Sequence, residues 1–328
     1  MKGHIKEGIE YNMRIIIFGA AGFIGTNLSL FLINQDIELT LVDRSKELFK
    51  KNILESKNVD IIESEFNLTT DFDSLLKNQD MVFHLISTTV PTTSNQHISE
   101  ELISNVVTTS KLLESCVRSN IKKFIFLSSG GTVYGADCSC PIKEEDCTNP
   151  ITAYGIQKLT IEKLLYLCKA MYGLDYKVIR LANPYGPYQK PNGILGAVTT
   201  FTYKAINGEN INLYGDGSVI RDFIYIDDAI KGILNISFGC SREHTYNLGS
   251  GKGTSIKDLI QEIDESLNVE LKITYLPKRK VDVPVNYLDV SKYENTYGDV
   301  QTVSLKEGIL KTAQYLENDY RKVLSESD

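Results

Sequence analysis

Short apolar runs alternate with longer amphipathic stretches along the first half of the chain. Each run is rich in β-branched residues and too short for a helix, as is typical of strands buried on both faces of a parallel sheet. The pattern predicts strands at 13–19, 38–42, 59–63, 81–86 and 123–128. Because parallel neighbours need a crossover connection, we expect an α/β fold in which helices link these strands.

Two long amphipathic stretches flank the last of these strands. Residues 99–119 place Leu102, Val106 and Leu112 along one apolar helical face, which predicts a helix. A second helix is expected over 152–172.

The second half of the chain is less regular. A strand near 178–181 precedes a loop-rich region, because Pro and Gly residues interrupt the pattern between 184 and 196. Short strands and helices then alternate, at 210–213, 227–237, 245–248, 255–267, 271–275 and 305–317. These segments predict a smaller α/β lobe at the C-terminal end.

Composition narrows the class of protein. The chain has 328 residues, of which 42% are hydrophobic, so it can bury a large core. Its formal net charge of -7 argues against a nucleic-acid partner, which usually requires Lys and Arg clustered on one face. No apolar run approaches the roughly 18 residues of a membrane-spanning helix, so we expect no membrane partner.

The 6 cysteines show neither the density of a disulfide framework nor an accompanying signal peptide, which favours a reducing, cytoplasmic location. Cys138, Cys140 and Cys147 lie close together in the sequence, but no fourth Cys or His has a suitable spacing for zinc. We therefore expect no metal site and interpret these three residues as surface thiols.

The first predicted strand runs directly into Gly19, Gly22 and Gly25, and Phe23-Ile24 opens the next helix. A strand-to-helix turn that lies against a pyrophosphate has no room for side chains, and the helix N-terminus behind it carries partial positive charge. Spaced glycines alone are a weak signal, but this context predicts a Rossmann-type, doubly wound sheet. We expect a dinucleotide-binding domain over 13–180, to which some later segments return, and a mainly substrate-binding lobe over 181–328.

Asp43 ends the second predicted strand, where the adenosine ribose of a dinucleotide would lie. A carboxylate there accepts hydrogen bonds from the ribose hydroxyls and repels a 2'-phosphate, so Asp43 favours NAD over NADP. Arg44 is the complication, because a guanidinium beside the ribose could tolerate a phosphate. Its plainer interpretation is a solvated charge after a strand.

Tyr154 and Lys158 lie one turn apart on the predicted helix over 152–172. A free tyrosine is a poor base at neutral pH, but a nearby cation and an oxidised nicotinamide both favour the phenolate. Such a spacing also arises by chance. The argument is strengthened by Ser128 and Ser129, because the carboxyl end of a buried strand delivers these hydroxyls to the sheet edge where ligands bind.

In combination, these motifs resemble the extended short-chain dehydrogenases that act on nucleotide sugars, and most closely the UDP-glucose 4-epimerase-like branch. The resemblance covers about residues 14 to 300. It includes Val82-Phe-His-Leu-Ile-Ser87, in which Ile86-Ser87 replaces the usual paired small residues, and it also includes Asn105 and Thr132-Val-Tyr-Gly135. It continues through Arg180-Leu-Ala-Asn183-Pro-Tyr-Gly-Pro187 and through Tyr214-Gly-Asp-Gly to Arg221-Asp-Phe-Ile-Tyr225.

The resemblance implies NAD as the cofactor. The residues that it implies for cofactor binding are Gly19, Gly22, Phe23, Ile24, Gly25, Asp43, Arg44, Glu65, Phe66, Leu85, Ser87, Asn105, Ser128, Tyr154 and Lys158.

One departure from the family pattern affects the mechanism. The family carries a catalytic Ser or Thr two positions before Thr132, and this chain has Gly130 there. Thr132 or Ser129 could supply the hydroxyl, and we favour Thr132; alternatively, Tyr154 handles the proton alone. The chain also lacks the Asp-Glu pair that family 4,6-dehydratases carry at positions 131 and 132, which disfavours dehydration.

A nucleotide-sugar substrate brings two phosphates, which guanidinium groups suit. The resemblance implies that Asn183, Arg221 and Arg279 contact the diphosphate, that Asp282 contacts the nucleotide ribose, and that Tyr214 packs near the base. Without the resemblance, Arg279 would be interpreted as part of a solvated basic loop.

The resulting expectation is NAD-dependent oxidoreduction at C4 of a UDP-, GDP- or dTDP-hexose, with C4 epimerisation as the leading reaction. Tyr154, Lys158, Thr132 and Ser129 are the candidate catalytic residues. The alternatives are a net 4-dehydrogenase or 4-ketoreductase, and an inactive NAD-binding protein. The resemblance also implies a homodimer formed by the helices near 100–118 and 152–170, and a role in polysaccharide precursor synthesis.

Overall fold

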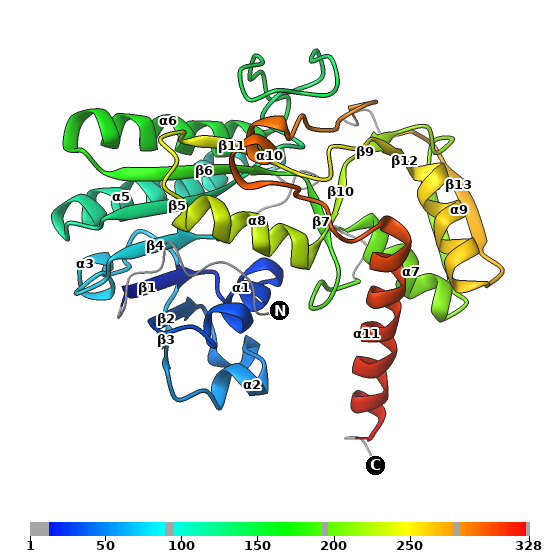
Figure 1. Ribbon diagram of the computed structural model, residues 1–328, viewed down its shortest axis with the longest axis horizontal. Coiled ribbons are helices and arrows are strands. Elements are labelled where there is room, and N and C mark those ends of the chain that lie inside the picture. The colour runs from blue at the N-terminus through cyan, green and yellow to red at the C-terminus, as the bar shows by residue number, and fades with distance from the viewer. Residues whose placement is uncertain (1–12, 89–94, 192–195, 279–282, 326–328) are drawn as a thin grey trace.

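The computed structural model describes residues 13–88, 95–191, 196–278 and 283–325, with side chains through residue 318. A sheet of seven parallel strands lies at its centre, in the order β11-β6-β5-β4-β1-β2-β3 (Figure 1). The strands are β1 (Met13–Phe18), β2 (Ile37–Asp43), β3 (Val59–Glu63), β4 (Met81–His84), β5 (Lys123–Ser129), β6 (Asp175–Leu181) and β11 (Thr245–Leu248). The strand order reverses beside β1, so the predicted Rossmann-type sheet is confirmed.

The sequence of β1 shows why this sheet is buried on both faces. Ile15, Ile16 and Ile17 have no exposed surface, and they alternate between two separate hydrophobic clusters. Successive side chains of a strand point to opposite faces, so a continuous apolar run must be covered by helices on both sides.

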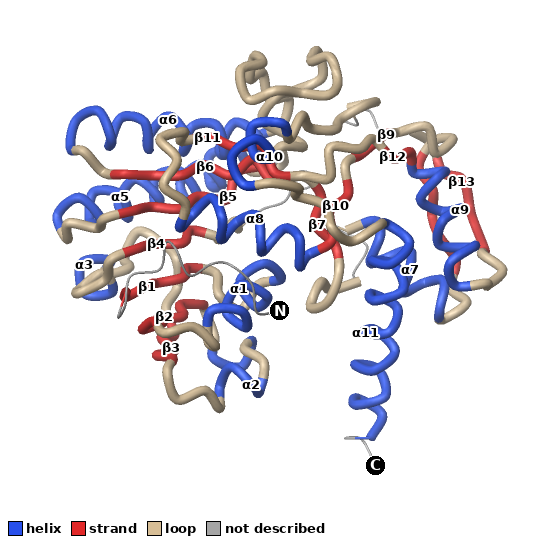
Figure 2. The backbone as a smooth tube through the Cα atoms, in the orientation of Figure 1, coloured by secondary structure: helices blue, strands red, loops and turns tan. Residues whose placement is uncertain are grey.

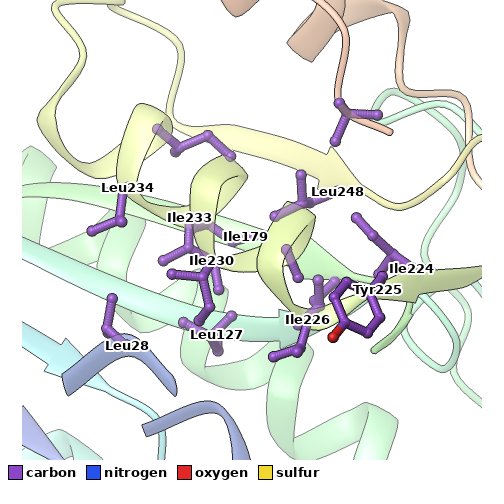
Figure 3. Packing of buried hydrophobic residues seen from close by; sticks show 14 of the residues in the cluster. Leu28, Leu127, Ile179, Ile224, Tyr225, Ile226, Ile230, Ile233, Leu234 and Leu248 are labelled. Atoms are coloured by element: carbon purple, nitrogen blue, oxygen red, sulfur yellow. The ribbon is translucent and has the colours of Figure 1, made fainter. Parts of the chain in front are cut away.

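Two groups of helices provide this cover. One face carries α3 (Phe72–Leu75), α5 (Thr108–Arg118) and α6 (Ala153–Tyr172), and the other carries α1 (Phe23–Leu32) and α8 (Ile226–Phe238). Figure 3 shows Ile230 and Ile233 of α8 close to Leu127 and Ile179 of the sheet. Short helices η1 (Lys46–Leu48) and α2 (Lys51–Leu54) follow β2.

The helix predicted over 99–119 is present but not uniform. It consists of α4 (Ile98–Glu101), a π-helical stretch η2 (Leu102–Val107) and α5. A π-helix is rare and is often found at a functional site. Its residue Asn105 is buried and points at the chain that follows β4.

A smaller lobe packs beyond the carboxyl ends of the strands (Figure 2). It contains α7 (Ala197–Ile206), α9 (Ile256–Leu267), α11 (Leu305–Ser325) and the parallel pair β8 (Asn210–Tyr214) and β13 (Lys272–Leu276). The remaining elements are β7 (Asn183–Tyr185), β9 (Ile220–Arg221), β10 (Phe223–Tyr225), β12 (Thr254–Ser255) and α10 (Ser291–Tyr297).

Two of the later segments lie on the main sheet rather than in this lobe, in line with the expected return of some later segments to the first domain. Residues 245–248 form β11, which pairs with β6 at the edge of the main sheet, and the helix expected over 227–237 is α8, which covers that sheet. Tyr246 and Leu248 are fully buried. Their apolar surface is covered only when the chain returns to the first domain.

Candidate active site

A single cavity of about 690 Å³ runs from the glycine turn after β1 to the smaller lobe. The ends of β4 and β5, the start of α6 and the segment after β6 contribute to its wall. This is the carboxyl edge of the parallel sheet, where open α/β sheets bind ligands. The cavity therefore lies where the sequence placed the site.

The glycine turn is shaped by close backbone approach. Gly19 has a φ of 82°, which favours glycine, and a Cβ atom at Gly25 would lie 2.2 Å from the Gly19 carbonyl oxygen. Gly22 is the N-cap of α1, no side chain caps this helix, and its first turn carries no acidic residue. Because Gly19, Gly22 and Gly25 line the cavity, the positive end of α1 is available to a pyrophosphate, as a dinucleotide requires.

Asp43 lies at the end of β2 beside this turn. Its Oδ2 atom accepts a hydrogen bond of 2.9 Å from the Ala21 backbone, and Oδ1 accepts one of 2.8 Å from the Arg44 backbone. Each carboxylate oxygen has a further lone pair for a ribose hydroxyl. The Arg44 residue is exposed. These contacts suit a dinucleotide ribose, although neither residue belongs to the cavity lining.

Two further implied cofactor residues, Glu65 and Phe66, also lie outside the cavity lining. Glu65 is exposed, and the ring of Phe66 packs against Phe18, Phe72 and His84 at centroid distances of 5.2 to 6.3 Å. Burial, reinforced by the charge of Lys158, lowers the pKa of His84 to about 3. His84 is therefore neutral, in keeping with the packing of its ring in this aromatic cluster.

Tyr154 and Lys158 both line the cavity from the first turns of α6. The helix begins after Thr152, whose side chain accepts a hydrogen bond from the Gly155 backbone. Lys158 Nζ donates to the Leu127 carbonyl at 2.8 Å and lies 5.6 Å from the centroid of the Tyr154 ring. The structure thus brings the predicted phenol and ammonium together.

The protonation of this pair differs from the sequence-based expectation. Burial lowers the pKa of Lys158 to about 8, and the Glu162 carboxylate opposes that shift. Burial also raises the pKa of Tyr154 to about 12. The interaction that opposes this rise is a hydrogen bond with the Ser87 side chain, not the charge of Lys158. In the protein alone, burial therefore sets the direction of the Tyr154 pKa shift, and the effect expected from Lys158 together with an oxidised nicotinamide stays a prediction.

Gly130 does not face the cavity. A Cβ atom there would lie 2.5 Å from Leu288 Cδ1 and 3.1 Å from the Arg180 carbonyl oxygen. Ser129 and Thr132 both line the cavity, and the Thr132 hydroxyl is buried without a hydrogen-bond partner among the described residues. The two candidate hydroxyls are therefore near the site, and a side chain at position 130 would point into the core.

Ser128 and Asn105 form hydrogen bonds with residues near the cavity. Ser128 also lines the cavity, and its hydroxyl donates to Glu162 Oε1 at 2.5 Å. Asn105 accepts from the Thr88 backbone at 3.0 Å and lies outside the cavity lining. Leu85 and Ser87, after β4, do line it.

The far end of the cavity is lined by Asn183, Tyr214 and Arg221. Asn183 donates to the Asp222 carbonyl at 2.8 Å, and Arg221 Nη1 donates to the Ile220 and Val283 carbonyls. These bonds hold the guanidinium at the cavity wall, where it can meet a phosphate. Arg279 and Asp282, the other two predicted contacts, lie outside the described residues.

Sequence reasoning missed two contributors. Glu162 forms a buried ion pair with Arg180 at 2.7 Å. It follows Lys158 by one helical turn in the sequence, and this separation could have indicated that Glu162 lies near the site. Residues Val198 and Phe201 of α7 also line the cavity, and no motif marked them.

The described residues hold neither a metal-binding group of side chains nor a membrane-spanning helix. They contain no group of three His, Cys, Asp or Glu side chains arranged to hold a metal ion. Within the same part of the chain, none of the helices has the length and apolar character needed to cross a membrane.

Fold and cavity together define a class: a Rossmann-type enzyme that holds a Tyr-Lys pair beside a dinucleotide site. A sequence profile of the NAD dependent epimerase/dehydratase family matches residues 15–249. The chain belongs to this family, and NAD is its cofactor.

Individual proteins resemble the chain along nearly all of its length. UDP-glucose 4-epimerase of Mycolicibacterium smegmatis is 29% identical over 310 residues, which cover 93% of this chain and 99% of that protein. The structure of Thermotoga maritima UDP-glucose 4-epimerase with UDP-glucose superposes with a TM-score of 0.88 at 32% identity, covering 94% of this chain and 100% of that one. Bacillus cereus UDP-glucuronic acid 4-epimerase, in complex with UDP-glucuronic acid and NAD, gives 0.84 at 26% identity, with 94% and 100% covered.

Proposed function

We propose that the protein interconverts the C4 epimers of a UDP-hexose, with NAD as cofactor. The observation that carries the proposal is the single cavity, which joins the glycine turn, the Tyr154-Lys158 pair and Arg221. A dinucleotide, a reacting sugar and a diphosphate need these three features in this order. The UDP-sugars bound by the relatives support uridine as the base.

Different residues along the cavity have different roles in the proposed reaction. The Tyr154 phenolate takes the proton of the sugar C4 hydroxyl and later returns it. Lys158 holds a positive charge beside the phenol, and Arg221 with Asn183 binds the diphosphate. When bound, NAD supplies the acceptor for the C4 hydride and gives that hydride back.

Epimerisation further requires that the 4-keto sugar present both faces in turn. The wall formed by α7 is apolar at Ala197, Val198 and Phe201 and polar at Thr200, so it offers few directional hydrogen bonds to a hexose. Anchoring through the diphosphate, at Arg221, leaves the sugar free to turn. We propose this division between a fixed nucleotide and a loosely held hexose.

Turnover with a panel of UDP-, GDP- and dTDP-hexoses tests the proposal. We expect C4 epimers to form from a UDP-hexose without accumulation of NADH. Stoichiometric reduction of the nicotinamide would instead support a net 4-dehydrogenase, and oxidation of NADH by a 4-keto sugar would support a 4-ketoreductase. Bound NAD without any product across the panel would indicate an inactive binding protein.

We also propose a cytoplasmic homodimer that supplies precursors for polysaccharides. The cysteine content supports the location, and exposed apolar side chains on the paired helices η2 and α6 support the dimer.

A further inference from the structure

Tyr154 has a hydroxyl partner, which comes from the segment after β4 rather than from the loop after β5. The loop after β5, where the family carries its Ser or Thr, has Gly130, and a Cβ atom there would contact Leu288 in the core. The Ser87 side chain, in the segment that follows β4, instead forms a hydrogen bond with the Tyr154 phenol. Ser87 and Tyr154 line the same cavity.

This hydrogen bond has a chemical consequence. It opposes the burial-driven rise in the pKa of Tyr154, so it favours the phenolate. A phenolate can only accept a hydrogen bond, so the Ser87 hydroxyl donates to Tyr154 once the phenol has lost its proton. The same bond fixes the direction in which the phenol oxygen points into the cavity.

The segment that carries Ser87 is held by hydrogen bonds to the π-helical stretch η2. The next residue, Thr88, donates its backbone N–H to Asn105 Oδ1 at 3.0 Å, and its hydroxyl accepts from Asn105 Nδ2 at 2.7 Å. Asn105 belongs to the π-helical stretch η2 and also donates to the Glu101 carbonyl. Gln157 of α6 donates to the buried Glu101 carboxylate at 3.0 Å, which ties the Tyr154 helix to the same bracket.

The other candidate hydroxyls, those of Thr132 and Ser129, form no such hydrogen bond with Tyr154 among the described residues. The Thr132 hydroxyl is buried with no hydrogen-bond partner among the described residues. Within the same part of the chain, Ser87 provides the side-chain hydrogen bond that acts on the Tyr154 phenol, and Ser129 provides none. Ser129 and Thr132 line the cavity, but they do not hold the base.

We propose that Ser87 is a positioning residue for the C4 oxidoreduction, and that it orients and polarises the Tyr154 phenol in place of a hydroxyl at position 130. The bracket of Asn105, Glu101 and Gln157 serves to place Ser87. This inference rests on the proposed function for its effect on the rate, but the contact between Ser87 and Tyr154 exists without a substrate.

Four single variants test the role: Ser87→Ala, the conservative Ser87→Thr, and the matched hydroxyl deletions Thr132→Val and Ser129→Ala. The first measurement is the NMR signal of Tyr154 in protein labelled at the tyrosine Cζ carbon, recorded at neutral pH without nucleotide sugar and assigned with Tyr154→Phe. We expect Ser87→Ala to shift this signal, because the phenol loses its hydrogen-bond partner, and the two controls to leave it in place. An unmoved signal in Ser87→Ala would overturn the proposal.

The second measurement is steady-state turnover of the substrate found in the hexose panel. A hydrogen bond to a charged oxygen is worth roughly a 10- to 100-fold change, so we expect Ser87→Ala to lower kcat by that factor, with KM changed less than about twofold. Ser87→Thr should recover most of the rate. A Ser87→Ala enzyme with the parent kcat would reject the role.

The two readouts separate this inference from the proposed function. If no hexose is turned over but Ser87→Ala still shifts the Tyr154 signal, the proposed function fails and the contact stands. If epimers form and the signal does not move, the role of Ser87 fails and the function stands.

Discussion

Tyr154 and Lys158 are ionisable groups held in a buried pocket, and burial disfavours the charged form of each. Strongly perturbed pKa values of this kind are common among functional residues. It predicts different consequences for the two side chains, because Tyr154 supplies the reacting oxygen and Lys158 supplies the charge.

Tyr154→Phe should abolish turnover and leave NAD binding nearly unchanged. The variant removes one oxygen, which carries the proton in the proposed reaction, and keeps the ring that packs in the cavity. Turnover of the UDP-hexose and the dissociation constant for NAD, measured by fluorescence quenching, are the two readouts. Activity within tenfold of the parent would show that another group is the base.

Lys158→Met should stabilise the protein at neutral pH while it removes activity. Lys158 has a pKa of about 8 in the folded protein, against 10.5 when unperturbed. Between these values the unfolded chain binds more protons than the folded protein, so the parent's stability rises with pH through this window. Below pH 8 the folded protein bears the full net cost of burying the cation, about 3 kcal/mol, with the opposing effect of the Glu162 carboxylate already included.

Urea unfolding of the parent and of Lys158→Met at pH 7 and pH 10 checks the sign. The variant's advantage should be greatest at pH 7 and should shrink by pH 10. A constant difference between the two proteins would mean that Lys158 is not titrating as proposed.

The sequence predicts which side chains lie together in the site better than it predicts their pKa values. Tyr154 and Lys158 are one helical turn apart, so a helix alone brings them to one face. The pKa of each depends on burial, which is set by segments distant in the chain. The hydrogen bond between Ser87 and Tyr154 also joins two segments that are distant in the chain. The spacing of residues along one helix therefore cannot predict it.

At the scale of elements, β5, β6 and α6 are joined beneath the cavity by a buried ion pair. Arg180 of β6 and Glu162 of α6 have side chains 7% and 6% exposed, and Glu162 also accepts from Ser128 of β5. The guanidinium further donates to the Tyr134 hydroxyl and lies 4.8 Å from its ring centroid. A pair so deeply buried depends on both partners.

Arg180→Met should therefore destabilise the protein by about 3 to 5 kcal/mol, because it leaves the Glu162 carboxylate buried and unpaired. The double variant Arg180→Met/Glu162→Leu should recover most of that loss, since it replaces both charges with apolar groups. Urea unfolding of the two single variants and the double variant measures the coupling. Additive losses would contradict a coupled pair.

Elements of the first half follow from the sequence because each strand is a continuous apolar run. Two features escape this reasoning. The π-helical turn η2 depends on packing rather than on an apolar period, and β11 is a strand of four residues whose partner, β6, lies far back in the chain. A short apolar run indicates a strand, but it does not indicate to which sheet the strand belongs.

At the scale of the whole molecule, the helical layer of η2, α5 and α6 leaves apolar side chains in solvent. Ile103 and Val107 of η2 are 46% and 43% exposed, and Ile156, Leu167 and Met171 of α6 are 47%, 51% and 64% exposed. The helices of this layer pack against one another in the monomer, and Figure 1 shows α5 and α6 side by side. An apolar face of this kind is suited to a second copy of the same layer.

The proposed homodimer is tested by charging that face. We expect the parent to have the mass of two chains by light scattering, and Ile156→Lys/Leu167→Lys to have the mass of one, because two ammonium groups would be buried against their symmetry copies. Leu310→Lys is the matched control, since Leu310 is 43% exposed on α11, away from this layer. NAD binding should persist in all three proteins, because the cavity is complete within one chain as far as it is described. A parent that is monomeric at micromolar concentration, or a charged variant that stays dimeric, would place the interface elsewhere or remove it.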